Sequence, residues 1–204
     1  GNSLGALLSE IVASTQPSLV RRLVLISPAT PPRLPDPRIH WPTALRLLGQ
    51  ATPILGKRAA RFLMGHYEPE ELVKLMMDST IYQPSRVAPD IVEQFVRLAE
   101  TRRSFPWAID AVPLTGRSIA QFFVPPRRFV SMIRSIKTPT LVVQGIEDRI
   151  VSPTAVEWLC SLRPDWTLIQ LADTGHTPQL DAPIRLLETI KPWLESNMMS
   201  EITA

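Results

Sequence analysis

Three short, mainly apolar runs divide the chain and have the length of buried β-strands. They cover residues 23–26, 140–143 and 166–171. Apolar runs of this kind, without a regular polar alternation, are typical of strands that are covered on both faces of a parallel sheet. The pattern therefore predicts a sheet that has helices on both sides.

Apolar residues at helical spacing separate these runs. A first helix face, close to the N-terminus, comprises Leu7, Leu8, Ile11 and Val12. A second helix is predicted over residues 152–162, with Ser152 as its cap and Pro153 as its first residue. A third opens at Pro178 and continues until Pro192 kinks or ends it. Strands that alternate with helices predict βαβ units, and the predicted fold class is α/β with a parallel sheet.

The stretch between the first two predicted strands has a different character. Its start contains Pro31, Pro32, Pro35, Pro37 and Pro42. This density of proline excludes a strand or a long helix there. Helical spacing follows over residues 70–78 and 90–103, and Asp90 is predicted to cap the second helix. We therefore predict a helical insertion over residues 31–125, within a core formed by residues 1–30 and 126–204.

Composition narrows the classes of protein that fit. The chain has 204 residues, of which 45% are hydrophobic and 20% charged, so a disordered chain is excluded. No apolar stretch is long enough for a transmembrane segment, and no signal peptide opens the chain. The net charge of +3 comes from scattered cations, which predicts no nucleic-acid partner. The single cysteine, Cys160, excludes an internal disulfide and fits a cytoplasmic location.

The first five residues, GNSLG, match the G-x-S-x-G pattern of a nucleophile elbow. In such an elbow a serine sits on a sharp turn between a strand and a helix, and the neighbouring glycines leave room for the turn. The N–H of the following residue, Leu4, then lies at a helix N-terminus and can stabilise an oxyanion. The pattern also fits a simple glycine-rich turn in which Ser3 caps a helix.

Two further polar turns follow the second and third predicted strands. The first, QGIEDRIV, contains Asp148, and the second, DTGHTP, contains His176. The carboxyl ends of parallel strands meet at one edge of a sheet, so these side chains are expected near Ser3. The chain order Ser, Asp, His and this placement suit a nucleophile, its orienting acid and its general base.

Other interpretations of these turns remain open. Glu147 and Asp173 are rival acids: the first is expected to point elsewhere, and the second to shape the histidine loop. Asp148 itself could be an Asx residue that stabilises a turn. His40 and His66 lie in the insertion, where they are poorly placed to meet a serine at the sheet edge.

Through these motifs the chain resembles the C-terminal two-thirds of an α/β-hydrolase-fold enzyme. The elbow, the acid turn and the histidine turn DTGHTPQLDAP all match that family, and residues 31–125 correspond to its variable helical cap. The resemblance implies that Ser3 is the nucleophile, His176 the general base and Asp148 the orienting acid. It also implies that the main chain of Leu4 supplies one oxyanion donor.

The same resemblance implies that part of the family fold precedes Gly1. Family members carry several strands before the elbow, together with a loop that supplies the second oxyanion donor. We therefore expect an N-terminally truncated chain in which the strand that presents Ser3 is missing. We expect such a chain to be weakly active or inactive by itself, because losing one oxyanion donor costs about 10²–10³ in rate.

A serine at the elbow suits hydrolysis of a small ester, thioester or lactone through an acyl-enzyme, with an apolar acyl-containing substrate. It argues against the related epoxide hydrolases and haloalkane dehalogenases, which use aspartate there. One alternative is a C–C bond hydrolase of the meta-cleavage product type, because the Gly-Asn-Ser elbow is similar to that of those enzymes. An alternative from another class is a non-catalytic protein that binds a small ligand beneath the cap.

The sequence says less about the substrate pocket. Candidate substrate-binding residues are Asn2, Trp107, Phe122 and Phe123, although aromatic residues at helical spacing are often core residues. No cofactor is expected, and no metal either, because the three histidines lack paired ligand spacing. The oligomeric state stays open.

Overall fold

A parallel three-stranded sheet, ordered β1-β2-β3, lies at the centre of the protein. The computed structural model describes residues 1–202, with side chains up to residue 196. The strands are β1 (Leu23–Ile26), β2 (Thr140–Gly145) and β3 (Thr167–Leu171). All three lie where the apolar runs predicted them, which confirms the α/β class.

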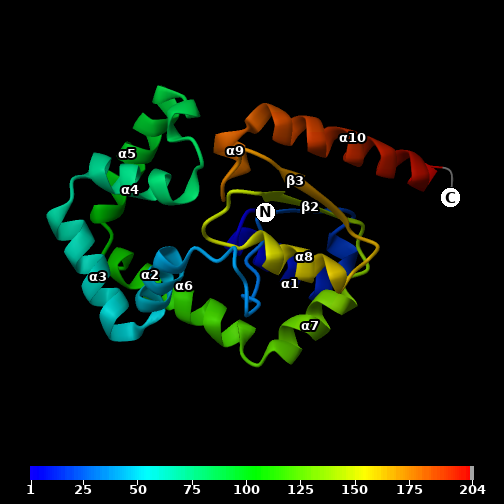
Figure 1. Ribbon diagram of the computed structural model, residues 1–204, viewed down its shortest axis with the longest axis horizontal. Coiled ribbons are helices and arrows are strands. Elements are labelled where there is room, and N and C mark those ends of the chain that lie inside the picture. Colours follow the sequence, from blue (N-terminus) through cyan, green and yellow to red (C-terminus); the bar gives the residue numbers. More distant parts are fainter. Residues whose placement is uncertain (203–204) are drawn as a thin grey trace.

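Helices make up most of the remaining described chain (Figure 1). They are α1 (Leu4–Thr15), α2 (Trp41–Ala51), α3 (Pro53–His66), α4 (Pro69–Thr80), α5 (Pro89–Arg103), α6 (Ala108–Phe123), α7 (Pro126–Ser135), α8 (Pro153–Ser161), α9 (Pro178–Asp181) and α10 (Pro183–Ile202). A 3₁₀ turn η1 (Pro17–Leu19) lies between α1 and β1, and a second, η2 (Pro84–Arg86), lies between α4 and α5. No helix within residues 1–202 is both long and apolar enough to cross a bilayer.

The sheet is the middle of three layers. On one face Leu25 and Val142 pack into a core with α1, α7 and α8. On the other face Leu141 and Val143 pack with Leu186 of α10. Figure 1 shows α10 above the sheet and the other three helices below it. This two-sided cover explains why the strands read as apolar runs rather than as alternating ones.

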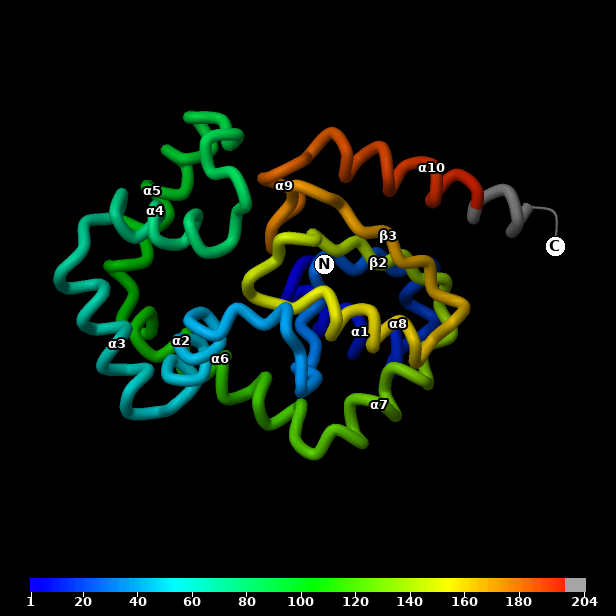
Figure 2. The backbone as a smooth tube through the Cα atoms, in the orientation of Figure 1, coloured from blue at the N-terminus to red at the C-terminus, as the bar shows by residue number. Residues whose placement is uncertain are grey.

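Helices α2 to α6 form a separate group beside the layered unit, which we call the α2–α6 array (Figure 2). Within it α6 packs against α2 and α3, and α4 packs against α5. A small second core lies between α4 and α5, built on Val73, Met77, Ile81 and Val87. The next helix, α7, returns to the sheet through Phe129 and Ile133, which are fully buried.

A third of the 21 prolines are the first residue of an α-helix. Seven of the described α-helices, including α3, α5 and α8, begin on a proline. The first turn of a helix has no intrahelical acceptor for its N–H groups, so the missing donor costs nothing there. At α8 the predicted cap is confirmed, because the Ser152 hydroxyl accepts the Thr154 N–H at 3.2 Å.

Several helix predictions were wrong in detail. Leu8 and Val12 of the predicted α1 face are exposed, and the helix buries Ala6, Leu7, Glu10 and Ala13 instead. Asp90 lies in the first turn of α5, whose cap position is Ala88. Pro192 lies inside α10, which continues to Ile202, while a break at Ala182 separates off α9. Helices α2, α3, α6 and α7 were not recognised individually.

The strand before the elbow is not wholly missing. The Ser3 N–H donates to the Ile26 carbonyl at 2.9 Å, and the Ile26 N–H donates to the Gly1 carbonyl at 2.8 Å. Asn2 thereby forms a parallel bridge with Ile26, next to β1. Gly1 and Asn2 therefore run beside the end of β1 and place Ser3 at the sheet edge.

One charged side chain is buried without a partner. Both carboxyl oxygens of Glu10 are buried on α1, and no described residue hydrogen-bonds to them. Burial raises the pKa of Glu10 well above its ordinary value. Burial, followed by the nearby charges of Glu10 and Glu157, also raises the pKa of the Cys160 thiol to about 12. Cys160 is therefore a protonated, unreactive thiol at neutral pH.

Phe129 lies at the centre of the core that α1, α7 and α8 form with the sheet. It is fully buried, and Phe122, Phe123 and Trp158 all pack against it. We expect Phe129→Ala to lower the free energy of unfolding by about 3–5 kcal/mol, through lost burial and a new cavity. Urea titration followed by circular dichroism measures this loss. Leu19→Ala, at a side chain that is 69% exposed, is the control and should change stability by less than about 0.5 kcal/mol.

Glu10 should make stability fall as pH rises. Its folded-state pKa is raised, so the folded protein binds the proton more tightly than the unfolded chain does, and stability is lost above the ordinary pKa of 4.5. We expect Glu10→Gln to be more stable than wild type by about 1–3 kcal/mol at pH 8, and less so at pH 4. Urea titration of both proteins at the two pH values tests this. An equal difference at both would contradict it.

Candidate active site

Ser3 occupies a strained turn between the strand end and α1. Its backbone has φ 52° and ψ −118°, a conformation that residues with a side chain rarely adopt. A Cβ on Gly1 would lie 2.4 Å from the backbone of Gly5, so the turn requires glycine at position 1. A Cβ on Gly5 would meet no described atom within 4 Å, so the expectation that both glycines make room holds only for Gly1.

Asp148 and His176 are brought together at the carboxyl ends of β2 and β3. His176 Nδ1 and Asp148 Oδ2 are 2.8 Å apart, and both residues are buried. The rival acids have other partners. The Glu147 carboxylate accepts the Thr174 N–H at 2.8 Å, and Asp173 is exposed beside the histidine loop, with φ 52°.

The Asp148 carboxylate accepts hydrogen bonds from three further donors. Oδ1 accepts the N–H groups of Ile150 and Val151 at 2.7 and 3.0 Å, and Oδ2 accepts Nε2 of Gln144 at 2.9 Å. These three donors, and no basic side chain, satisfy the buried carboxyl group beside the imidazole.

Asn2 links the elbow to the histidine loop. Its side-chain Nδ2 donates to the carbonyls of Ile26 and His176, each at 3.1 Å. The residue next to Ser3 thus holds the backbone of His176 beside the elbow. The first predicted pocket residue is therefore part of the framework that joins the two loops.

Two glycines allow the loops to approach closely. A Cβ on Gly145 would lie 2.1 Å from the Gly175 carbonyl oxygen, and one on Gly175 would lie 2.8 Å from the Thr80 carbonyl oxygen. The same Thr80 oxygen accepts the backbone N–H of His176 at 2.7 Å. The end of α4 is thus in direct contact with the histidine loop.

Asp181 fastens this contact and was not recognised from the sequence. Its carboxylate is buried and accepts the N–H groups of Gly175 and Tyr82, each at 2.7 Å, and of Gln83 at 3.1 Å. Gln144 was also missed. Both residues are polar and lie within or next to a motif, which is the only signal that the sequence offers for them. Their roles depend on hydrogen-bond partners, and partners that are distant in the sequence leave no pattern in it.

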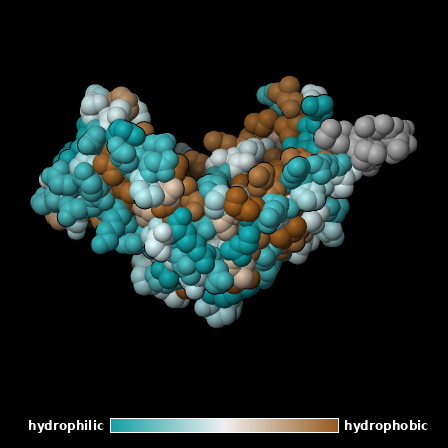
Figure 3. Space-filling model, turned by 90° about the horizontal axis from the view of Figure 1, so that it is seen from above, coloured by the Kyte–Doolittle hydropathy of each residue, from teal (hydrophilic) through white to brown (hydrophobic). Residues whose placement is uncertain are grey.

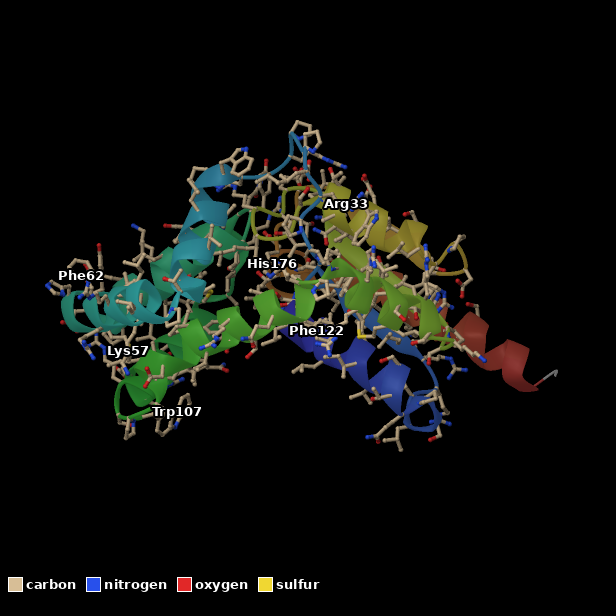
Figure 4. All side chains as sticks on the ribbon, turned by 90° about the horizontal axis from the view of Figure 1, so that it is seen from below. Arg33, Lys57, Phe62, Trp107, Phe122 and His176 are labelled. Atoms are coloured by element: carbon tan, nitrogen blue, oxygen red, sulfur yellow. The ribbon has the colours of Figure 1, made fainter. Side chains whose placement is uncertain are left out.

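The predicted aromatic pocket residues do not gather around His176. Phe122 and Phe123 pack edge-on against Phe129 in the core. Trp107 is 56% exposed and stacks on Phe105. Figure 4 shows Trp107 at the far end of α6 from Phe122 and from His176.

Two cavities lie within the α2–α6 array. One, of about 260 Å³, is lined by residues of α3 to α6 that include Met64, Met76 and Phe95. The other, of about 340 Å³, lies where α2 meets α5 and α6. From above, the surface is also hollowed between the array and the layered unit, and hydrophobic side chains gather beside this hollow (Figure 3). Among the described residues, no cluster of His, Cys, Asp and Glu could hold a metal ion.

The chain belongs to the alpha/beta hydrolase family, whose model matches residues 1–189. Over 51 residues it is 37% identical to Lipase 1 of Psychrobacter immobilis, a stretch that covers 25% of this chain and 16% of that protein. This family assignment confirms the resemblance drawn from the three motifs.

Solved structures support the same fold. A haloalkane dehalogenase from Agrobacterium tumefaciens C58 matches with a TM-score of 0.73 at 16% identity, covering 95% of this chain and 65% of that one. The 2-hydroxy-6-oxo-6-phenylhexa-2,4-dienoate hydrolase from Rhodococcus sp. strain RHA1 matches with a TM-score of 0.67 at 19% identity, covering 98% and 62%. The chain thus spans less than two-thirds of the length of either structure.

Asp181 should control the order of the histidine loop. We expect Asp181→Asn to speed amide hydrogen exchange at Gly175, Tyr82 and Gln83, because an amide accepts through one oxygen and turns an NH₂ toward the donors. The free energy of unfolding should fall by about 1–3 kcal/mol. Exchange followed by mass spectrometry tests this, with Asp90→Asn on exposed α5 as the control. Unchanged exchange at Gly175 would refute the role.

Proposed function

We propose that the protein is a serine hydrolase that cleaves a small ester, thioester or lactone with an apolar acyl group. Ser3 is the nucleophile, His176 the general base and Asp148 the acid that orients it. The observation that carries this proposal is the 2.8 Å contact between buried His176 and Asp148, held beside the strained Ser3 elbow through Asn2.

The tautomer of His176 follows from this contact. Nδ1–H donates to the Asp148 carboxylate, which leaves Nε2 unprotonated and able to accept the Ser3 hydroxyl proton. The Ser3 oxygen then bonds to the substrate carbonyl carbon, and the imidazolium returns its proton to the leaving alcohol or thiol. Water, deprotonated by the same Nε2, cleaves the acyl-enzyme and releases the acid.

The oxyanion is stabilised at the N-terminus of α1. Leu4 is the first residue of this 12-residue helix, so its N–H has no acceptor within the helix. The helix dipole adds partial positive charge at the same place. Leu4 therefore supplies one oxyanion donor, worth about 10²–10³ in rate when such a donor is removed.

C–C bond hydrolysis is the second candidate. It is supported by the Gly-Asn-Ser elbow and by the structural likeness to the dienoate hydrolase. The ester reaction is favoured by the local sequence identity to Lipase 1. A panel of p-nitrophenyl esters, run beside a ring-fission dienoate, separates the two. A ligand-binding protein without catalysis would hydrolyse neither. The partly buried, free thiol of Cys160 suits the cytoplasmic location that we also propose.

Ser3 should be the residue that forms the covalent intermediate. We expect a fluorophosphonate probe to label the wild-type chain at the peptide containing Ser3, and Ser3→Ala to lose both the adduct and ester turnover. Ser27→Ala is the matched control, because Ser27 also lies at a strand end with positive φ, and it should keep the label. Labelling is read by mass spectrometry of the digested protein. A label on Ser27, or a label that survives Ser3→Ala, would overturn the proposal.

A further inference from the structure

Helix α2 has its apolar face turned outward. Trp41, Leu45 and Leu48 share one side of the helix, at spacings of four and three, and are 53%, 63% and 67% exposed. The opposite side carries Thr43, which is buried, and Gln50, which lines the cavity at α6. A surface helix in a globular protein normally buries its apolar stripe, so this stripe is available to an apolar partner.

The start of α3 extends the same kind of surface. Ile54 and Leu55 are 67% and 59% exposed, only a few residues after Leu48. Farther along α3, Phe62 lies at the outer edge of the molecule, away from His176 (Figure 4). We define the α2–α3 face as the exposed side chains of Trp41, Leu45, Leu48, Ile54 and Leu55.

The chain segment that forms this face carries charge of one sign. Residues 37–67 contain no aspartate or glutamate. They carry the cations Arg38, Arg46, Lys57, Arg58 and Arg61. Two of them have carboxylate partners elsewhere, since Arg38 pairs with Glu157 at 2.5 Å and Lys57 with Asp110 at 2.7 Å. The other three are exposed arginines in or next to the α2–α3 face.

The face is held rigidly by the loop that precedes it. Asp36 accepts the hydroxyls of Ser152 and Thr154 at 2.5 and 3.0 Å. Arg38 donates to Thr154 and forms its ion pair with Glu157 of α8. Helix α8 packs on β2 and β3, so these bonds fasten the loop before α2 to the β2–β3 part of the sheet. Asn2 lies at the opposite edge, next to β1. In Figure 4, α2 and α1 lie toward opposite sides of the view.

We infer that the α2–α3 face docks onto the surface of an anionic lipid bilayer. Leucine and isoleucine side chains enter the boundary between headgroups and acyl chains, and Trp41 sits at the headgroup level. Arg46, Arg58 and Arg61 meet the lipid phosphates. The binding is peripheral, with the helices parallel to the membrane plane, and it does not depend on the chemistry proposed for Ser3.

Vesicle sedimentation tests this inference with the full chain. We expect the protein to pellet with vesicles of equimolar phosphatidylglycerol and phosphatidylcholine, and weakly with phosphatidylcholine alone. Leu45→Gln with Leu48→Gln should weaken binding by about tenfold or more, through lost apolar burial. The matched control, Leu98→Gln with Leu187→Gln, changes two leucines that are 51% and 60% exposed on α5 and α10, and it should bind as wild type does.

The arginines and Trp41 provide independent readouts. Replacing Arg46, Arg58 and Arg61 by glutamine should weaken anionic-vesicle binding by about fivefold for each residue, and added salt should do the same. Brominated lipids should quench tryptophan emission in the wild type, and Trp41→Phe should remove most of that quenching. The quenching is measured on the wild-type protein, so a folding defect in the glutamine variants does not decide the outcome.

Four results would overturn the inference. They are no binding to anionic vesicles, equal binding to neutral ones, equal loss in the control variant, or quenching that survives Trp41→Phe. A dimer in sedimentation equilibrium that Leu45→Gln with Leu48→Gln abolishes would assign the face to a second copy of the chain instead.

Discussion

The hydrogen bond between Asp148 and His176 is the contact around which the loops of this protein are arranged. It joins the ends of two neighbouring strands, and both partners are buried. A buried carboxylate is costly unless donors surround it, and here Ile150, Val151 and Gln144 provide them. The backbone must therefore curl tightly around Asp148, and that curl fixes where the following helix, α8, begins.

Glu10 shows what the same charge costs without such donors. It is buried on α1 as completely as Asp148 is in its turn, but its oxygens have no described hydrogen-bond partner, and burial raises its pKa. The protein thus contains one buried carboxyl group that accepts several hydrogen bonds and one that accepts none from the described residues. The difference comes from local backbone donors, since neither carboxylate is paired with a lysine or arginine in the described contacts.

The parts of this fold that could be predicted are those with a local signal. The strands were found because β1, β2 and β3 are apolar runs of strand length, and Ser3, Asp148 and His176 because each lies in a short motif next to such a run. The motifs also led to the correct family, while the roles of these three residues stay proposals.

The other features could not be predicted, because they depend on partners that are distant in the sequence or on an apolar helix face that points outward. Asp181 and Gln144 act through partners that no spacing reveals. Helix α2 was missed because its apolar stripe begins within a proline-rich stretch, and its outward orientation contradicts the rule that apolar faces point inward. Pro192 was expected to kink or end the last helix, and α10 does not end there.

Besides the packing of α6 against Phe129, the α2–α6 array is attached to the sheet unit through the two loops that carry the Asp148–His176 pair. At one attachment Asp36 binds Ser152 and Thr154, directly after the turn that surrounds Asp148. At the other, Asp181 binds the backbone of Gly175, next to His176, and of Tyr82, at the end of α4. Both attachments use a carboxylate that accepts several hydrogen bonds, so each is directional and rigid. A displacement of α2 or α4 would therefore pull on one partner of the pair, and a 2.8 Å hydrogen bond tolerates little movement. Any surface that holds the array in place would by the same path hold the histidine in place.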